Sequence, residues 1–81
     1  MNISEYDDVA ADEEGLKRFS AAMRAKLDKK RGEGRGGWNR DYQCTVRSLK
    51  QMLRNHLKKG DMVDIANFAM MIWNREHPTG E

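Results

Sequence analysis

Residues 61–75 read DMVDIANFAMMIWNR, and apolar side chains predominate in this segment. Between Met62 and Trp73 only Asp64 and Asn67 are strongly polar, so apolar side chains would cover nearly the whole circumference of a helix. A helix that is apolar on all sides has to be surrounded by protein. We therefore expect residues 61–75 to form a buried helix. Two partner helices in one protomer cannot easily cover it, and a second copy of the chain is expected to do so.

The residues before this stretch predict a second helix that packs against it. Its stripe begins after Thr45, an acceptable N-cap, and comprises Val46, Leu49, Met52, Leu53, His56 and Leu57. Gly60 suits the left-handed residue that follows a helix, and Asp61 can cap the next helix. Because the two helices are then joined by a tight turn, we predict a C-terminal antiparallel helical hairpin.

A third helix is predicted nearer the N-terminus, from about Asp12 to Lys30. Its apolar stripe has spacings of three and four and comprises Leu16, Phe19, Met23 and Leu27. Residues 1–11 lack such periodicity and are expected to form a flexible acidic N-terminus, and residues 77–81 a flexible tail. The prediction is an all-α fold with one small three-helix domain over residues 12–76, assembled into an oligomeric helical bundle.

Length and composition exclude several classes of protein. A chain of 81 residues makes one domain, and its single cysteine, Cys44, cannot form a disulfide within the chain. His56 and His77 lie in different contexts and suggest no zinc site. No apolar run approaches the roughly 18 residues that cross a bilayer, so no membrane partner is expected. An unpaired thiol without a signal peptide favours the cytoplasm, and oligomerisation is the stabilising device left.

Charge is distributed unevenly along the chain. Residues 1–14 have a net charge of −6, whereas residues 17–40 have a net charge of +7. This asymmetry favours an anionic partner, or an acidic segment that lies across a basic surface. A solvated charged face explains it equally well.

An acidic and polar line on the last helix is the first candidate site. Asp61, Asp64 and Asn67 recur every three residues and therefore share one helix face. Carboxylate and carbonyl oxygens with retained waters are what Mg²⁺ prefers, so Asp61 and Asp64 are candidate metal ligands. The alternatives are that Asp61 is an N-cap, that Asp64 interacts with the helix dipole, and that Asn67 bonds to a neighbouring helix.

The basic, glycine-rich residues 29–38 are the second candidate. Arg31 and Arg35 can bind phosphate oxygens with two hydrogen bonds each, and Trp38 can stack on a base. The pattern matches neither the P-loop nor the dinucleotide-binding motif. A helix end followed by a linker, with Trp38 in the core, is the alternative. His56 is interpreted as a packing residue, and Cys44 has no activating partner in the sequence.

Residues 36–38 (Gly-Gly-Trp) and 61–72 (DMVDIANFAMMI) resemble phage-encoded proteins related to the MazG-like all-α nucleoside triphosphate pyrophosphohydrolases. The likeness covers roughly residues 19–75. It implies a Mg²⁺ site made of two acidic pairs, of which Asp61 and Asp64 resemble the second. Asn67 follows where the family often has a polar residue in contact with the ligand. The first pair is missing, because its counterparts are Asn55 and Lys58.

This departure leads to the functional expectation. Two carboxylates in place of four do not readily assemble a metal cluster that activates water, so we expect a degenerate, catalytically silent scaffold. It is expected to bind a nucleotide or another phosphorylated ligand through Arg31, Arg35, Trp38 and Asn67, as a phage accessory protein in the host cytoplasm. The alternatives are an active Mg²⁺-dependent pyrophosphohydrolase, and an adaptor that binds nucleic acid or a host protein.

Overall fold

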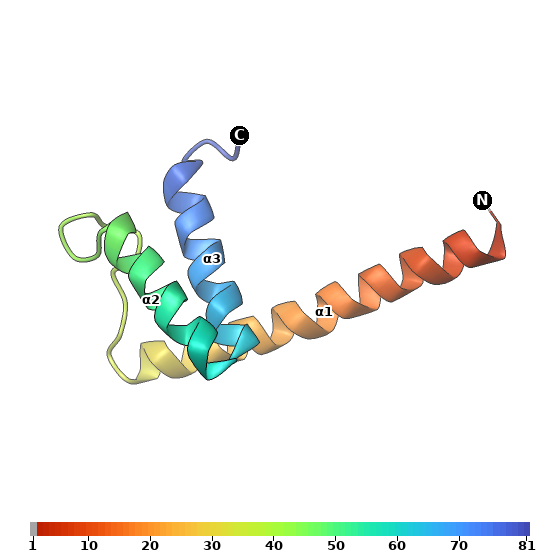
Figure 1. Ribbon diagram of the computed structural model, residues 1–81, viewed down its shortest axis with the longest axis horizontal. Coiled ribbons are helices and arrows are strands. Elements are labelled where there is room, and N and C mark those ends of the chain that lie inside the picture. Colours follow the sequence, from red (N-terminus) through yellow and green to blue (C-terminus); the bar gives the residue numbers. More distant parts are fainter. Residues whose placement is uncertain (1) are drawn as a thin grey trace.

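The computed structural model describes residues 2–81 and contains three helices over that range: α1 (Ile3–Gly32), α2 (Val46–Lys59) and α3 (Met62–Glu76) (Figure 1). Residues 2–81 contain no strand, so the prediction of a small all-α fold is confirmed. In the part of the chain described, none of the helices combines the length and apolar content that a membrane crossing requires.

Local capping residues set the ends of α2 and α3. The Thr45 side chain accepts a hydrogen bond from the Ser48 backbone N–H, and the Asp61 side chain accepts one from the Asp64 backbone N–H. Gly60 has a φ of 72°, a conformation that an L-residue with a Cβ rarely adopts. These three capping roles were predicted correctly, because capping depends on residues next to one another in the sequence.

The prediction that the first helix starts at Asp12 is wrong. α1 begins at Ile3, with Asn2 as its N-cap, and the Asn2 Oδ1 atom accepts from the Glu5 backbone N–H at 2.9 Å. Residues 3–11, expected to be frayed or extended, are therefore the first turns of one continuous helix, and Met1 lies outside the described residues. A polar cap followed three residues later by Glu is a known signal for a helix start.

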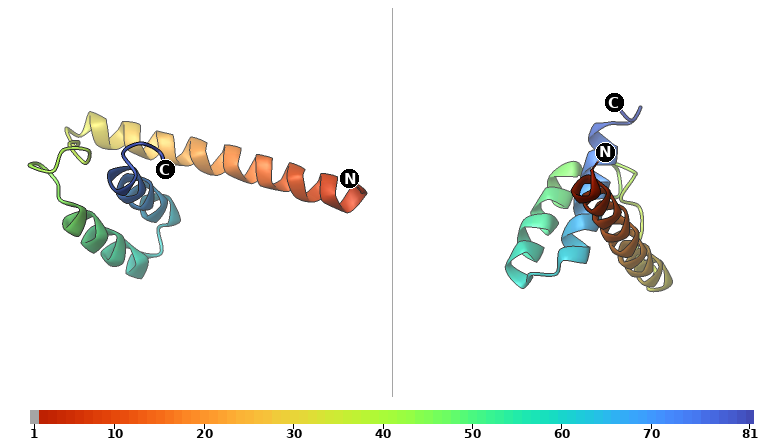
Figure 2. Two further views of the ribbon diagram at one scale, coloured as in Figure 1. Left: turned by 90° about the horizontal axis from the view of Figure 1, so that it is seen from above. Right: turned by 90° about the vertical axis from the view of Figure 1, so that its right-hand side faces the viewer.

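α3 packs against both other helices (Figure 2). The most buried apolar side chain is Leu49 of α2, which is 1% exposed, and Ile72 of α3 is also buried. The side of α3 that carries Met62 and Trp73 faces solvent, and Trp73 is 48% exposed. One chain therefore buries part of the apolar circumference of α3 and leaves the rest uncovered.

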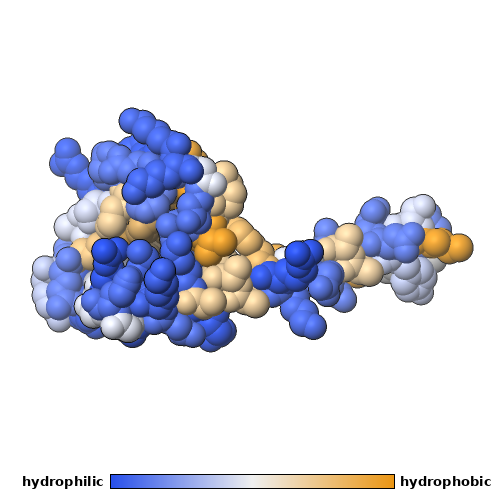
Figure 3. Space-filling model, turned by 90° about the horizontal axis from the view of Figure 1, so that it is seen from below, coloured by the Kyte–Doolittle hydropathy of each residue, from blue (hydrophilic) through white to orange (hydrophobic). Residues whose placement is uncertain are grey.

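The first half of α1 stands away from the rest of the molecule. Residues 2–22 are exposed, including Leu16, which is 70% exposed, and Phe19. Of the four residues of the predicted apolar stripe, Met23 and Leu27 are half-buried, and Leu16 and Phe19 are exposed. Figure 3 shows apolar side chains gathered where α1 leaves the packed helices, and smaller, separate apolar patches along the otherwise hydrophilic protruding part. We call residues 3–22 the free half of α1.

Candidate ligand-binding site

A cavity of about 220 Å³ lies among the three helices and the loop that joins α1 to α2. Its apolar wall includes side chains from all three helices. The charged and polar residues that line it are Lys26, Lys30, Arg31, Arg35, Trp38, His56, Asp64 and Asn67. The cavity therefore brings together residues that are far apart in the sequence, and it brings them together within one chain.

Charge and burial are separated within this cavity. Arg31 and Arg35 are exposed, whereas Leu49 and Asn67 are buried. The Arg31 Nη1 atom donates to the Arg35 carbonyl oxygen at 3.1 Å, which folds the loop back over the end of α1. A Cβ atom at Gly36 would overlap the Arg31 guanidinium, so the glycine permits this close approach. The cavity thus has a cationic rim and an apolar interior.

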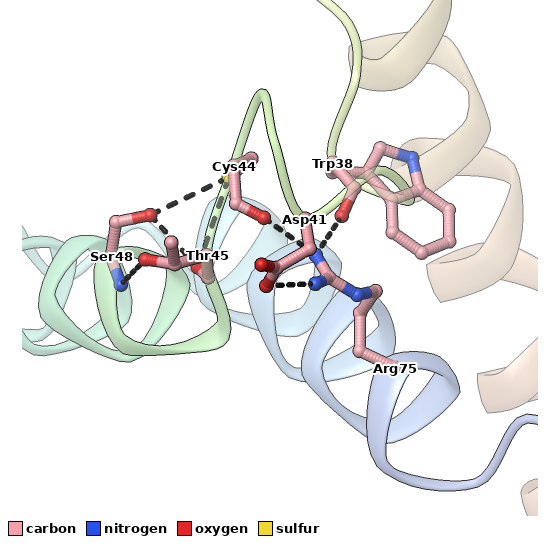
Figure 4. A network of polar contacts seen from close by, with 6 residues as sticks. All are labelled: Trp38, Asp41, Cys44, Thr45, Ser48 and Arg75. Carbon is pink, nitrogen blue, oxygen red and sulfur yellow. Dashed lines mark hydrogen bonds and ion pairs between the residues drawn. The ribbon is translucent and has the colours of Figure 1, made fainter.

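Arg75 of α3 holds the loop in place (Figure 4). Its Nη1 atom donates to the carbonyl oxygens of Trp38 at 2.7 Å and Cys44 at 2.6 Å, and its Nη2 atom donates to Asp41 Oδ1 at 2.9 Å. These bonds tie both ends of residues 38–44 to α3. Trp38 lines the cavity and is half-buried, so it belongs both to the packing and to the candidate site.

Asn67 crosses from α3 to α1. Its Nδ2 atom donates to the Met23 carbonyl oxygen at 3.2 Å, and because a carbonyl only accepts, this bond fixes the orientation of the amide. Asn67 is 4% exposed, and its Oδ1 atom is buried with no hydrogen-bond partner among residues 2–81. A buried acceptor without a partner costs about 1–3 kcal/mol, so a structure that retains one requires an explanation.

The two candidate metal ligands are bridged by a lysine of α1. Lys26 Nζ lies 3.3 Å from Asp61 Oδ2 and 3.5 Å from Asp64 Oδ1. The hydrogen bond with Asp61 and the charge of Asp64 raise the pKa of Lys26 above its usual value. The Asp64 backbone N–H and the Lys26 ammonium lower the pKa of Asp61.

These residues do not fit a magnesium centre. An ammonium group already stands where a divalent cation would neutralise the two carboxylates, and it would have to leave first. The second Asp64 oxygen lies 3.7 Å from His56 Nε2. Over the described part of the chain, no group of three or more His, Cys, Asp or Glu side chains is placed to hold a metal ion.

His56 is held by its surroundings on several sides. Its ring packs against Phe68 with 4.9 Å between centroids, and Nδ1 lies 2.9 Å from the Met52 carbonyl oxygen. That carbonyl only accepts, so Nδ1 donates to it, and Nε2 faces the Asp64 carboxylate. The packing interpretation of His56 agrees with these contacts. Its ring also lines the cavity.

Of the predicted site residues, Arg31, Arg35, Trp38, Asn67 and Asp64 line the same cavity. Asp61 does not line it and acts as the cap of α3. The sequence interpretation missed the contributions of Lys26 and Arg75. Lys26 lies three residues after Met23 and therefore on the predicted stripe, which was an available signal. No local signal identifies Arg75, because its acceptors belong to a loop more than thirty residues away.

Comparison with known proteins adds no relative. No family model, curated protein or solved structure matches the chain. The candidate site is therefore interpreted from its own geometry, and the resemblance to MazG-like enzymes stays a prediction.

Proposed function

We propose that this protein binds a nucleotide, or another phosphorylated ligand with an aromatic part, and does not turn it over. The observation that supports the proposal is the cavity with an apolar interior and an arginine rim. Arginine forks bind phosphate oxygens, and an indole such as Trp38 can stack on a base.

The size of the cavity suits one part of a nucleotide and not the whole molecule. Sites that enclose a whole small molecule measure about 300–1,000 Å³, whereas this cavity measures about 220 Å³. Only the base would enter beside Trp38. The phosphates would stay at the rim, where Arg31 and Arg35 are exposed.

Asn67 would supply selectivity. Its unpartnered Oδ1 atom needs a donor, and the exocyclic amino group of a base is one. A ligand that donates there would satisfy a buried acceptor, whereas a ligand without that group would leave it unsatisfied. Such a difference is worth about 1–3 kcal/mol.

The absence of turnover in the proposal follows from Lys26. A hydrolase of this kind would need a metal to activate water, and Lys26 forms ion pairs with Asp61 and Asp64 instead. The proposal therefore includes a degenerate MazG-like scaffold, in keeping with a phage accessory protein of the host cytoplasm. Release of pyrophosphate from a nucleotide panel in Mg²⁺, abolished by Asp64→Ala, would contradict it.

Thermal unfolding with and without ligands tests the binding. A ligand at a hundred times its Kd stabilises the folded state by about 2.7 kcal/mol, which raises the Tm of a domain this small by roughly 10 °C or more. We expect nucleoside triphosphates to raise the Tm more than the nucleoside alone. Arg31→Ala with Arg35→Ala should remove that difference, while Arg47→Ala, an exposed arginine outside the cavity, should preserve it.

The result that would overturn the proposal is an unchanged Tm with every nucleotide at millimolar concentration. A shift that is equally large in the Arg31→Ala, Arg35→Ala double variant would assign the binding to another surface.

The proposed working form is a homo-oligomer. What supports it is the outer side of α3, where Met62 and Trp73 are exposed in one chain. Large exposed apolar side chains on one face of a helix are typical of a contact with another protein.

A further inference from the structure

The free half of α1 presents an apolar stripe that no part of its own chain covers. Tyr6, Val9, Leu16 and Phe19 recur at helical spacings, interrupted by Asp12 between Val9 and Leu16, on the face that carries Met23 and Leu27 farther along. Asn67 bonds to the Met23 carbonyl oxygen at the point where the covered part begins. The same stripe is therefore partly buried at one end of the helix and exposed at the other.

The chain exposes far more surface than a compact monomer of its mass. A compact protein of 9.4 kDa exposes about 5,000 Å², whereas this chain exposes 6352 Å². The radius of gyration is 15.4 Å, against about 12 Å for a compact chain of this length. The excess surface, roughly 1,300 Å², is larger than the ~800 Å² that each partner buries in a stable dimer.

The charges of α1 favour a second copy, and they favour one orientation. Six of the seven acidic residues of α1 lie in the first half of the helix, whereas residues 24–31 carry Arg24, Lys26, Lys29, Lys30 and Arg31 against the seventh, Asp28. Two such helices side by side in antiparallel orientation place each acidic segment against a basic one. In parallel orientation the two acidic segments would repel each other.

We propose that the free half of α1 is a dimerisation arm, which docks antiparallel on α1 of a second copy. The two helices cross near Leu16 and Phe19, and each arm reaches the part of its partner where α1 meets α3. The arm, residues 3–22, is about 30 Å long. This inference rests on the proposed homo-oligomer and is independent of ligand binding.

The oligomeric state tests the apolar part of the interface. By sedimentation equilibrium, the natural chain is expected to dimerise at micromolar concentration. Leu16→Glu and Phe19→Glu should each raise the dimer dissociation constant by about tenfold or more. Both side chains are exposed in the single chain, so the fold is expected to survive, and circular dichroism checks this. Ala21→Glu, an exposed position on the other side of the same helix, makes the same charge change and should leave the dimer intact.

A charge exchange tests the orientation. Asp8→Lys with Asp12→Lys, and Arg24→Glu with Lys29→Glu, should each weaken self-association. An equimolar mixture of the two variants should associate more strongly than either variant alone, because the reversed charges of one variant then lie against the reversed charges of the other. None of the four positions lines the cavity, so nucleotide-induced thermal shifts should be unchanged in both variants.

Three results would overturn the proposal that the free half of α1 is a dimerisation arm. One is a natural chain that stays monomeric at all accessible concentrations, which would assign the stripe to a different protein. Another is a dimer that Leu16→Glu leaves intact, or that Ala21→Glu disrupts equally. The last is a mixture of charge variants that does not associate. If one of these results is obtained and nucleotides still raise the Tm, the dimerisation proposal is wrong and the proposed ligand binding is unaffected.

Discussion

The two halves of α1 have similar apolar spacing and different surroundings. Leu16 and Phe19 in the free half are exposed, whereas Met23 and Leu27 in the second half are partly buried against the rest of the chain. The second half also supplies Lys26, which pairs with α3. An amphipathic pattern therefore identifies the face of a helix that needs a neighbour, and it does not say whether that neighbour belongs to the same chain.

The largest expected difference between the packed helices and the free half of α1 is in how much a side chain contributes to the free energy of unfolding. Leu49→Ala removes the most buried apolar side chain and should lower the free energy of unfolding by about 2–5 kcal/mol. Leu16→Ala, measured at a concentration where the chain is monomeric, should change it by less than about 0.5 kcal/mol. Urea unfolding measures both. Equal losses would show that the free half is packed in the single chain.

A second difference concerns residues 38–44 of the loop between α1 and α2, which Arg75 of α3 holds by hydrogen bonds. Arg75→Met removes hydrogen bonds to Trp38, Asp41 and Cys44, and should destabilise the fold by about 1–3 kcal/mol. It should also speed the reaction of Cys44 with a thiol reagent, because the loop is no longer anchored. Arg47→Met, at an exposed arginine with no such bonds, is the control. An unchanged thiol reaction rate would show that other contacts fix the loop.

Replacing either of two glycines by alanine should have a smaller effect on stability, favourable at Gly15 and unfavourable at Gly60. Gly15 lies inside the free half with open space around it, so Gly15→Ala should favour helix there by about 0.5–1 kcal/mol and raise the ellipticity at 222 nm. Gly60→Ala forces an L-residue into a left-handed conformation and should cost about 1–2 kcal/mol in urea unfolding. If Gly15→Ala lowers the helix content, the free half is not a simple solvated helix.

The smallest expected effect is on pH dependence. The pKa of Asp61 is lowered. Its contribution to stability is therefore present above about pH 3.8 and is lost as the pH falls through the folded-state pKa. The pKa of Lys26 is raised. Its contribution to stability is therefore present below about pH 10.5 and is lost as the pH rises through the folded-state pKa. Lys26→Met should flatten the stability profile at both extremes. Lys17→Met, in the free half, should leave that profile unchanged.

A structural feature of this molecule can be predicted from the sequence when the residues that determine it are close together in the chain. The caps at Thr45, Gly60 and Asp61 were predicted because their partners are adjacent in the chain. The early start of α1 was missed because acidic residues hide its periodicity, although Asn2 and Glu5 formed a readable start signal.

The same distinction applies to the candidate site. Arg31, Arg35 and Trp38 were chosen by residue type and Asn67 by its spacing and the MazG-like resemblance, and the four line one cavity. Asp61 and Asp64 were chosen as metal ligands by their spacing and by the same resemblance. The position of Lys26 between them depends on how α1 packs on α3, which no local pattern contains.

The unbroken course of α1 has a mechanical consequence. The helix runs for about 45 Å from Ile3 to Gly32, and its second half provides one wall of the cavity. A force on the protruding end acts through a long lever arm whose fulcrum lies near the Met23–Asn67 hydrogen bond. A sideways load there would therefore transmit torque to the wall that carries Lys26, Lys30 and Arg31.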